Sequence, residues 1–419
     1  MNFMKKTLTI SFSFLLLLQT TFAAELPVLS TLSTESMIPV ADFAKKIIGQ
    51  AEDITTVYYE SKIDPQLTLE ESDGQNYLFG HPSGKCFQCG TFRTELVQTL
   101  IDNTKSFVIG GGNFNIMIRE DVGAVQAESE NCGATFQVAS NFNCLEYMDN
   151  AKNYSKYGIT IYHVDRTQGP AASISAAPGT FYRNYFVPHV VGVKIYHGQL
   201  EQQINLLDIF VGETLFGITI PSIPVSNGYI QMQESDLSKI QALLTDDHDK
   251  VMFNFYVNQV KVGIHEDIQV TSGLRMRDSK ITVCQDPHQV VNQVFSAAIN
   301  LSQSSGGQHA ELLGHPGLEL VARMLLTASY QGTIRAAAIK SQTSTLPGSN
   351  KVFLTMIGGG AFENQTSWIV DAIESCREII ERSGLEVYLM LYNGFEKFTD
   401  KDAETKLRTL VSDTGGTIK

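Results

Sequence analysis

The sequence predicts an α/β protein in which helices cover both faces of a mixed central sheet. Short apolar runs alternate with amphipathic helical segments along most of the chain. Three strand-like runs also end in loops rich in glycine or polar residues, at Ser140–Asn143, Asp165–Ala171 and Gly358–Asn364. If these loops meet at one edge of the sheet, they form a single ligand-binding cleft.

The clearest of these junctions is a strand, a glycine loop and a helix in direct succession. Lys351–Ile357 is a short apolar run typical of a buried strand, and Gly358, Gly359 and Gly360 follow at once. Apolar residues then recur at helical spacing from Trp368 to Ile380, and Gly384 is a plausible end of that helix.

Glycine lets the main chain approach a ligand and point successive N–H groups into one concavity, and the following helix adds its positive end. The junction therefore suits a diphosphate. A tight turn without a ligand is the alternative, because glycine runs have many false positives. No Gly-Lys-Ser/Thr follows, and the spacing is not GxGxxG, which argues against ATP hydrolysis and dinucleotide redox chemistry.

Other segments are assigned from period and composition. Predicted helices are Val40–Ile48, Glu95–Ile101, Ala172–Ala177, Ser235–Leu244 and Pro316–Lys340. Predicted strands are Phe114–Ile118, Ala134–Ser140, Tyr157–Val164, Thr180–Phe186, Phe253–Val262 and Glu386–Tyr392. Asp73–Gly84 is expected to be a loop, and Gly110–Gly112 a turn.

Polar amides at the end of the Ala134–Ser140 strand are candidate ligand contacts. Asn141 and Asn143 stand where open α/β sheets bind ligands. The alternative is that one of them caps a helix that starts in Asn141–Glu146.

The long helix Pro316–Lys340 carries Glu319, Arg323, Thr327 and Gln331 along one stripe. Such a stripe is usually the solvent face of a helix. The other possibility is a helix that walls a polar cleft, with Glu319 as its carboxylate.

Composition limits the partners. The net charge of −13 on 419 residues argues against a nucleic-acid partner and favours a cationic group on the substrate. Lys5 and Lys6 precede an apolar run and a small-residue end at Ala23–Ala24, which predicts a signal peptide over residues 1–24. The mature protein is expected to be exported, to the periplasm, the extracellular space or a host cell, with no membrane span.

Six cysteines remain. Cys86 and Cys89 form a CxxC without a second CxxC or a histidine pair, so structural zinc is disfavoured and a disulfide or two thiols are the options. Asp246–Asp249 is expected to be a solvated loop. No metal and no cofactor is predicted.

Together these pieces resemble a macrodomain, the three-layer α/β/α fold that binds ADP-ribose. More specifically, TFQVASNFNCLE, DRTQGPAASISAAPGTFYRNYF and VFLTMIGGGAFENQTSWIVDAI are similar to an atypical, MavL-like macrodomain family of ADP-ribosyl-arginine hydrolases. The resemblance implies a partly helical extension at 25–105, a macrodomain-like domain at 106–419 and an insertion at about 187–267.

The resemblance also implies a set of site residues. Asp165 and Glu319 are the expected catalytic carboxylates. The expected ADP-ribose contacts are Asn141, Asn143, Gln168, Gly169, Tyr182, Arg183, Gly358, Gly359, Gly360, Ala361, Phe362 and Asn364. An ion pair of Asp165 with Arg166 or Arg183 is the alternative role for that carboxylate.

This chain departs from the family pattern at two places. Glu363 replaces a small residue beside the predicted diphosphate site, and Thr327 and Gln331 stand where acidic residues are more usual.

The predicted activity is therefore removal of mono-ADP-ribose from arginine on a modified protein, with ubiquitin as one candidate. Two alternatives remain open: a module that binds ADP-ribose without turnover, and an exported effector that docks a host protein or the ubiquitin machinery through the insertion.

Overall fold

The computed structural model describes residues 37–53, 66–118, 121–148, 158–187, 204–215, 217–245, 250–275, 278–302 and 310–419. The predicted signal peptide and the Asp246–Asp249 loop lie outside these residues.

One large mixed sheet dominates the described chain. Nine strands lie in the order β2-β3-β4-β11-β14-β6-β15-β16-β5. The last five are mutually parallel, whereas β11, β4, β3 and β2 pair in antiparallel fashion. The strands are β2 Leu67–Ser72, β3 Gln75–Gly80, β4 Lys85–Leu96, β5 Asn113–Ile118, β6 Thr135–Ala139, β11 Lys261–Gln269, β14 Val290–Ser296, β15 Lys351–Leu354 and β16 Glu386–Leu391.

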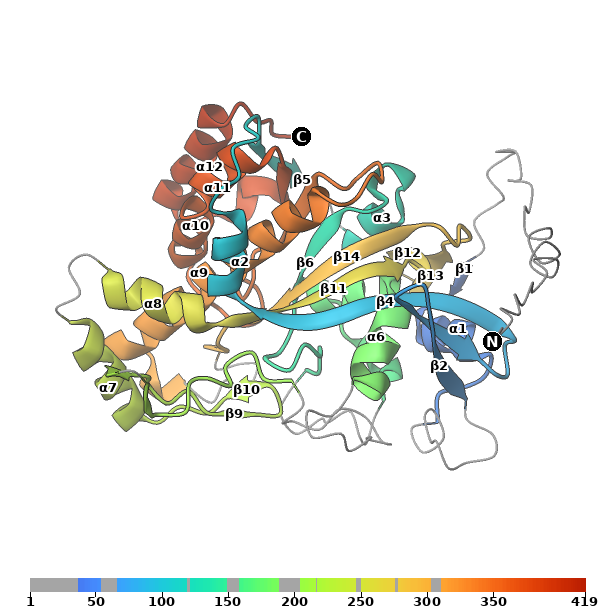
Figure 1. Cartoon of the computed structure of the whole chain (residues 1–419), viewed down its shortest axis with the longest axis horizontal. Helices are drawn as coiled ribbons and strands as arrows, with labels where there is room; N and C mark the ends of the chain where they lie inside the picture. The colour runs from blue at the N-terminus through green and yellow to red at the C-terminus, as the bar shows by residue number, and fades with distance from the viewer. Residues whose placement is uncertain are drawn as a thin grey trace, which may run out of the picture. The chain divides into compact units, whose positions relative to one another are not determined.

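Figure 1 shows β4, β11, β14 and β6 side by side at the centre of the fold. The short strands outside this sheet are β1 Met37–Pro39, β7 Thr214–Leu215, β8 Ile218–Thr219, β9 Val225–Ser226, β10 Tyr229–Ile230, β12 Ser272–Arg275 and β13 Lys280–Val283.

The helices of the described chain are α1 Phe43–Ile48, α2 Val97–Thr104, α3 Val122–Ala127, α5 Gln168–Ser175, α6 Ala177–Phe181, α7 Glu234–Leu244, α8 Val251–Gln259, α9 Pro316–Ser341, α10 Thr366–Glu374, α11 Arg377–Ser383 and α12 Lys401–Asp413. Short 3₁₀ and π turns are η1 Val40–Asp42, η2 Ser129–Asn131, η3 Thr160–Val164, η4 Tyr182–Phe186, η5 Ala310–Leu312 and η6 Gly394–Lys397.

Helices cover both faces of the sheet. On one face the side chain of Gln137 in β6 donates to Ser329 O and Thr333 Oγ1 of α9. On the other face Gln293 of β14 donates to Ala172 O of α5. Since successive residues of a strand point to opposite faces, this places α9 and α5 on opposite sides. The predicted α/β architecture, with a mixed sheet between helical layers, is confirmed.

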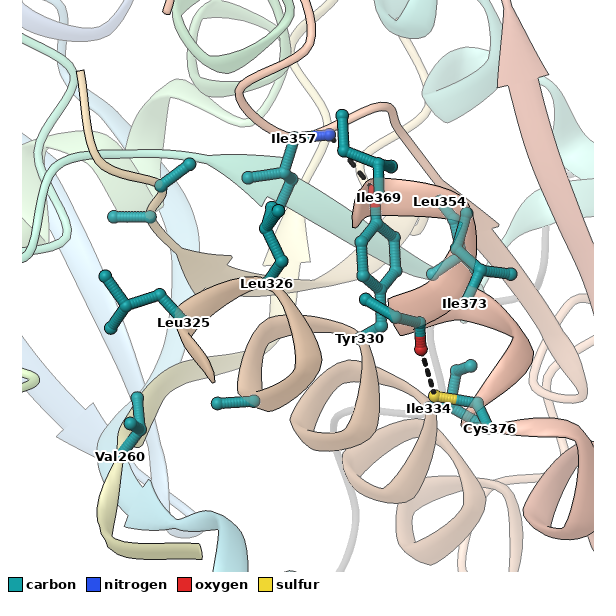
Figure 2. Packing of buried hydrophobic residues seen from close by; sticks show 14 of the residues in the cluster. Val260, Leu325, Leu326, Tyr330, Ile334, Leu354, Ile357, Ile369, Ile373 and Cys376 are labelled. Atoms are coloured by element: carbon teal, nitrogen blue, oxygen red, sulfur yellow. Dashed lines mark hydrogen bonds between the residues drawn. The ribbon is translucent and has the colours of Figure 1, made fainter. Parts of the chain in front are cut away.

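The central strands are buried on both faces, as their near-continuous apolar sequences require. Every residue of β14 is buried, and the rings of Phe136, Phe353 and Tyr388 stack across β6, β15 and β16 at centroid distances of 4.7 and 5.3 Å. Figure 2 shows the α9 side of this core, where Tyr330 and Ile334 pack against Ile369, Ile373 and neighbouring side chains of β15 and α10.

The segment before β5 differs from expectation. Asp73–Gly84 was expected to be a loop, but Gln75–Gly80 forms β3 within an antiparallel meander that joins the sheet through β4 and β11. Tyr77, Leu78 and Phe79 supply the strand-forming residues. The extension at 25–105 thus contributes strands as well as the predicted helices near Val40–Ile48 and Glu95–Ile101.

Three predicted strands are helical instead. Thr160–Val164 is the 3₁₀ turn η3, Thr180–Phe186 belongs to α6 and η4, and Val251–Gln259 is α8. Aromatic and β-branched residues dominate these segments, and α6 and η4 are buried on all sides. A helix buried on all sides shows no 3.6-residue period, so Thr180–Phe186 resembled a strand. In α8, which is only partly buried, the aromatic and β-branched content alone favoured a strand.

Within the described ranges, we find no helix long and apolar enough to cross a bilayer.

Candidate functional site

The carboxyl ends of β6, β14 and β15 lie side by side, because these strands are parallel neighbours. Helix α5 follows β6 onto one face, whereas α10 follows β15 and packs on α9 at the opposite face. Adjacent connections that leave to opposite faces open a crevice between the strand ends, which is where open α/β sheets bind ligands.

The ladder between β6 and β15 stops early, and Gln168 takes its place. The two strands pair at Thr135 and Phe136, and beyond that point the Gln168 amide donates to Gln137 O and accepts from Ala139 N. Gly169 is required beside it, since a Cβ there would lie 1.9 Å from Ala139 O. Both predicted residues lie at this edge, where their contacts bring α5 onto the end of β6.

The glycine loop after β15 is exposed at Gly359 and Gly360. Gly358 has φ +72°, in the left-handed region, and Asn364 N donates back to Gly358 O at 2.9 Å. Within the described residues, the amides of Gly358, Gly360 and Phe362 donate to no protein acceptor. Main-chain amides without an acceptor are typical of anion-binding loops, and α10 begins two residues beyond Asn364.

Tyr330 of α9 fixes the corner at which this loop starts. Its hydroxyl donates to Thr355 O at 2.6 Å and accepts from Ile357 N at 3.1 Å. Figure 2 shows the ring rising from α9 beside Ile369, with its hydroxyl at the Ile357 nitrogen. The buried helix and the glycine loop are thereby coupled.

A second set of bonds joins the glycine loop to the loop after β14. Leu301 N donates to Phe362 O, and Asn364 Nδ2 donates to Ile299 O at 2.9 Å. Asn364 is buried, and its Oδ1 has no partner among the described residues. The side chain of Asn364 therefore clamps the two loops together and retains one unused acceptor.

The backbone oxygen of Glu363 accepts no hydrogen bond from the amides of the glycine loop. Its side chain accepts from Ser302 Oγ at 2.8 Å, and its φ of +56° is in the left-handed region that non-glycine residues seldom adopt. The departure from a small residue at this position thus ties the glycine loop to the β14 loop.

Asn141 and Asn143 shape a turn after β6. Asn141 Nδ2 donates to Tyr147 O, and Asn143 Oδ1 accepts from Leu145 N. No helix begins at Asn141–Glu146, so the helix-cap alternative is wrong. Both side chains are largely buried, at 6% and 2% exposed, and among described residues Asn141 Oδ1 and Asn143 Nδ2 have no protein partner.

Two sequence-predicted contacts lie in the core instead of at the loops. Arg183 has no exposed surface, and its guanidinium contacts Glu146 Oε1 at 3.4 Å, Cys144 O at 3.0 Å and the ring of Phe295 at 3.7 Å. Tyr182 is also buried, which raises the pKa of its hydroxyl to about 12. In this arrangement Arg183 is a packing residue with no surface for a ligand arriving from solvent.

Burial raises the pKa of the Glu146 carboxyl to about 7, against the opposing effect of the Arg183 guanidinium. The same burial, together with Arg183, lowers the pKa of His265 well below its ordinary value. Sequence reasoning missed Glu146, although its position just after the Asn141–Asn143 turn could have drawn attention to it.

Asp165 lies just before α5. Its Oδ1 accepts from Thr167 N at 2.7 Å, and the guanidinium of Arg275 binds its backbone oxygen. The proposed ion pair with Arg183 is not formed, because that guanidinium is paired with Glu146. The catalytic assignment of Asp165 stays a prediction.

Glu319 lies in an ion-pair network on α9. Arg323 joins Glu319 at 2.7 Å to Asp371 of α10 at 2.9 Å. Eleven residues separate Glu319 from Tyr330, which contacts the end of β15, so the two are about 16 Å apart along the helix axis. These contacts favour the solvent-face alternative for the stripe.

Further groups of interest lie elsewhere. Gly110–Gly112 precedes β5 and therefore lies at the opposite edge of the sheet, as a turn whose Gly110 N donates to Arg382 O.

The structure describes all six cysteines, and none forms a disulfide. No cluster of three or more metal-binding side chains occurs in the described part of the chain.

Sequence reasoning also missed two aromatic residues at the carboxyl edge of the sheet, Tyr392 and Tyr229. Tyr392, directly after β16, is 60% exposed, and Ile118 at the end of the adjacent β5 is 47% exposed. Tyr229, from the insertion, lies 6.3 Å from Phe362 between ring centroids. Tyr392 ends a predicted strand, whereas nothing local indicates where Tyr229 lies.

No protein-family model and no curated protein sequence matches the chain. Among solved structures the chain is similar to poly(ADP-ribose) glycohydrolases. That of Thermomonospora curvata has a TM-score of 0.39 at 9% identity, covering 78% of this chain and 92% of that one. Its complex with the inhibitor ADP-HPD gives 0.37 at 9% identity, with 78% and 91% covered. The Deinococcus radiodurans enzyme in complex with ADP-ribose gives 0.36 at 9% identity, with 77% and 94% covered.

These TM-scores lie below 0.5, so the chemistry of the site is inferred from this chain's own residues. The narrower resemblance to ADP-ribosyl-arginine hydrolases stays a prediction.

Proposed function

We propose that the protein binds ADP-ribose at the carboxyl edge of its sheet and hydrolyses mono-ADP-ribose from arginine on a modified protein. The observation that carries this proposal is the glycine loop, where the amides of Gly358, Gly360 and Phe362 have no acceptor among the described residues. A diphosphate satisfies such amides without any lysine or arginine, which suits a chain of net charge −13.

The residues beside the loop give the ligand a direction. On the β16 and β5 side, Tyr392 and Ile118 offer exposed apolar surface suited to a nucleobase. On the β6 and β14 side, Asn141 and Asn143 offer amide groups suited to sugar hydroxyls. We place the adenosine over β16 and β5 and the terminal ribose over β6 and β14.

Hydrolysis requires carboxylates at the sugar end. The bond joins the anomeric carbon of the ribose to a guanidinium nitrogen, so its cleavage needs a stabilised oxocarbenium-like carbon, a positioned water and a counter-charge for the guanidinium. Asp165, on the connection that follows β6, is supported by its place next to α5. Glu319 is supported less, because Arg323 already neutralises it.

A module that binds ADP-ribose without turnover is the second candidate. It is favoured by the α9 stripe, where Thr327 Oγ1 is bonded to Arg323 O and the Gln331 amide to Ser375 O. Neither residue supplies an acid, and the carboxylate of the stripe is ion-paired. Ubiquitin as the modified protein and export through residues 1–24 belong to the same proposal as further expectations.

Calorimetry with ADP-ribose tests the binding proposal. Gly360 is the informative position, because a Cβ there meets nothing within 4 Å and its φ is not positive. Gly360→Ala should therefore keep the fold and place a methyl group only in the path of a ligand. We expect the wild type to bind and the variant to bind at least tenfold more weakly, which corresponds to about 1.4 kcal/mol.

Release of ADP-ribose from mono-ADP-ribosylated arginine protein tests turnover. The wild type is compared with Asp165→Asn and with Glu319→Gln, both of which remove charge at nearly constant shape. Loss of release in Asp165→Asn with retained binding supports the hydrolase. Tight binding by the wild type without release leaves the binding module, and no binding at all leaves a docking role for the insertion.

A further inference from the structure

A hairpin from the insertion is docked on the turn after β6. Strands β9 and β10 are joined by Asn227 and Gly228, with φ of +49° and +78°, a pair typical of a tight two-residue hairpin. Phe142 N donates to Gly228 O at 2.8 Å. A Cβ on Gly228 would lie 2.7 Å from both Asn141 Cβ and Asn143 Oδ1, so only glycine lets the hairpin come this close.

The next residue, Tyr229, reaches from this hairpin to the glycine loop. Its hydroxyl donates to Tyr147 O at 2.6 Å, the same oxygen that accepts from Asn141 Nδ2 at 3.0 Å. Its ring lies 6.3 Å from the ring of Phe362 at an angle of 54°. Tyr229 is thus fixed at its hydroxyl by the Asn141 turn and meets Phe362 through its ring.

We propose that Tyr229 is a ligand-binding residue that forms, with Phe362, an aromatic wall against the terminal ribose of a nucleoside diphosphate sugar. This inference rests on the proposed function. The wall lies on the side of Asn141 and Asn143, the amides suited to the sugar, and across the glycine loop from Tyr392 at the end of β16. Aromatic faces exclude water and pack on the apolar face of a sugar, while the amides bind its hydroxyls.

This placement makes the insertion a specificity element. A ligand that ends at the diphosphate does not extend to Tyr229, whereas a ligand with a terminal ribose does. The class of ligand selected by the wall is therefore a nucleoside diphosphate that carries a sugar.

Calorimetry with two ligands, ADP-ribose and ADP, tests the inference on the full chain. We expect Tyr229→Ala to bind ADP-ribose about tenfold more weakly than the wild type, while ADP affinity changes less than about twofold. Tyr229→Phe keeps the ring and loses the bond to Tyr147 O, so it should stay within about threefold of the wild type for ADP-ribose. Val211→Ala, an exposed position elsewhere in the insertion, should change neither affinity.

Thermal unfolding of each variant is measured first. If Tyr229→Ala does not fold, Tyr229→Leu, which retains apolar volume, takes its place with the same expected contrast between ligands. Equal weakening for both ligands, or no weakening for either, would overturn the inference while the proposed function stands. Failure of the wild type to bind ADP-ribose would instead remove the proposed function, and this inference with it.

Discussion

Replacing Tyr330 with phenylalanine should weaken ligand binding from a position that no ligand touches. The ring of Tyr330 is fully buried on α9, and its hydroxyl holds Thr355 O and Ile357 N at the corner where the glycine loop begins. Tyr330→Phe keeps the ring and removes both bonds.

The expected loss of unfolding free energy follows from these contacts. A buried hydrogen bond contributes about 1 kcal/mol net, and an orphaned buried group costs about 1–3 kcal/mol. Thr355 O loses its tyrosine donor, but Ile357 N keeps a second acceptor in Thr355 O at 2.9 Å. The sum is therefore about 1–2 kcal/mol. A loosened corner must also be ordered when the ligand binds, for which we expect about 1 kcal/mol, or roughly a fivefold higher Kd for ADP-ribose.

Urea unfolding and calorimetry measure the two effects separately. Tyr256→Phe is the matched control, because Tyr256 is a buried tyrosine of the insertion whose hydroxyl donates to Thr219 O at 2.8 Å. The control should lose stability to a similar extent and keep its Kd. A Tyr330→Phe variant that is destabilised yet binds ADP-ribose as the wild type does would refute the coupling between α9 and the loop.

Three further predictions concern single residues near the loops. Gly358→Ala should lower the free energy of unfolding in urea by about 2 kcal/mol or more, because φ is +72° and the new Cβ would lie 2.6 Å from Ala298 Cβ. The control Gly415→Ala, with φ +70° and open space around the Cβ, should lower it by only about 1 kcal/mol. Equal losses in the two variants would show that the contact with Ala298 is not tight. Glu363→Gln should tighten ADP-ribose binding severalfold in calorimetry, since it removes a negative charge beside the diphosphate and keeps the bond from Ser302 Oγ; weaker binding would mean that the carboxylate contacts the ligand. Glu146→Gln should flatten the pH dependence of stability: the folded state keeps the carboxyl proton up to about pH 7, whereas the unfolded chain releases it near 4.5, so the wild type loses stability as pH rises between these values and is level above them. Urea midpoints from pH 5 to 8 check this, and an unchanged slope in the variant would assign the effect to another group.

The sequence predicted the parts of the site that depend on local pattern. The strand at Lys351, the glycine loop and the helical end at Gly384 occur within a few residues of their predicted bounds, because period and glycine placement are encoded within one short segment. The predicted single helix from Trp368 to Ile380 is divided into α10 and α11, which meet at Ser375 and Cys376. The same holds for α9, which is long enough for its apolar period to be unambiguous.

Local pattern could not predict contacts made by residues far apart in the chain. Gln168 was expected to contact a ligand, but its amide completes the end of β6 next to β15. Tyr229 reaches Phe362 only because the hairpin turn fits against Asn141 and Asn143, and that fit is a property of the assembled sheet edge. An Asn-Gly pair such as Asn227 and Gly228 indicates a tight turn in the sequence but gives no information about what the turn packs against.

Arg183 was predicted to contact a ligand, but the structure places it in the core. A buried guanidinium is costly unless it is paired and hydrogen-bonded, and Arg183 meets Glu146, Ser173 Oγ and Cys144 O. Cys144 follows Asn143 directly and has a φ of +60°, a strained conformation for a residue with a side chain. The bond from Arg183 Nε to Cys144 O at 3.0 Å holds that residue in place, and with it the turn that presents Asn141 and Asn143. The buried pair of Arg183 and Glu146 therefore fixes the backbone that carries the two amides proposed to bind the sugar, and Arg183 needs no exposed surface for this role.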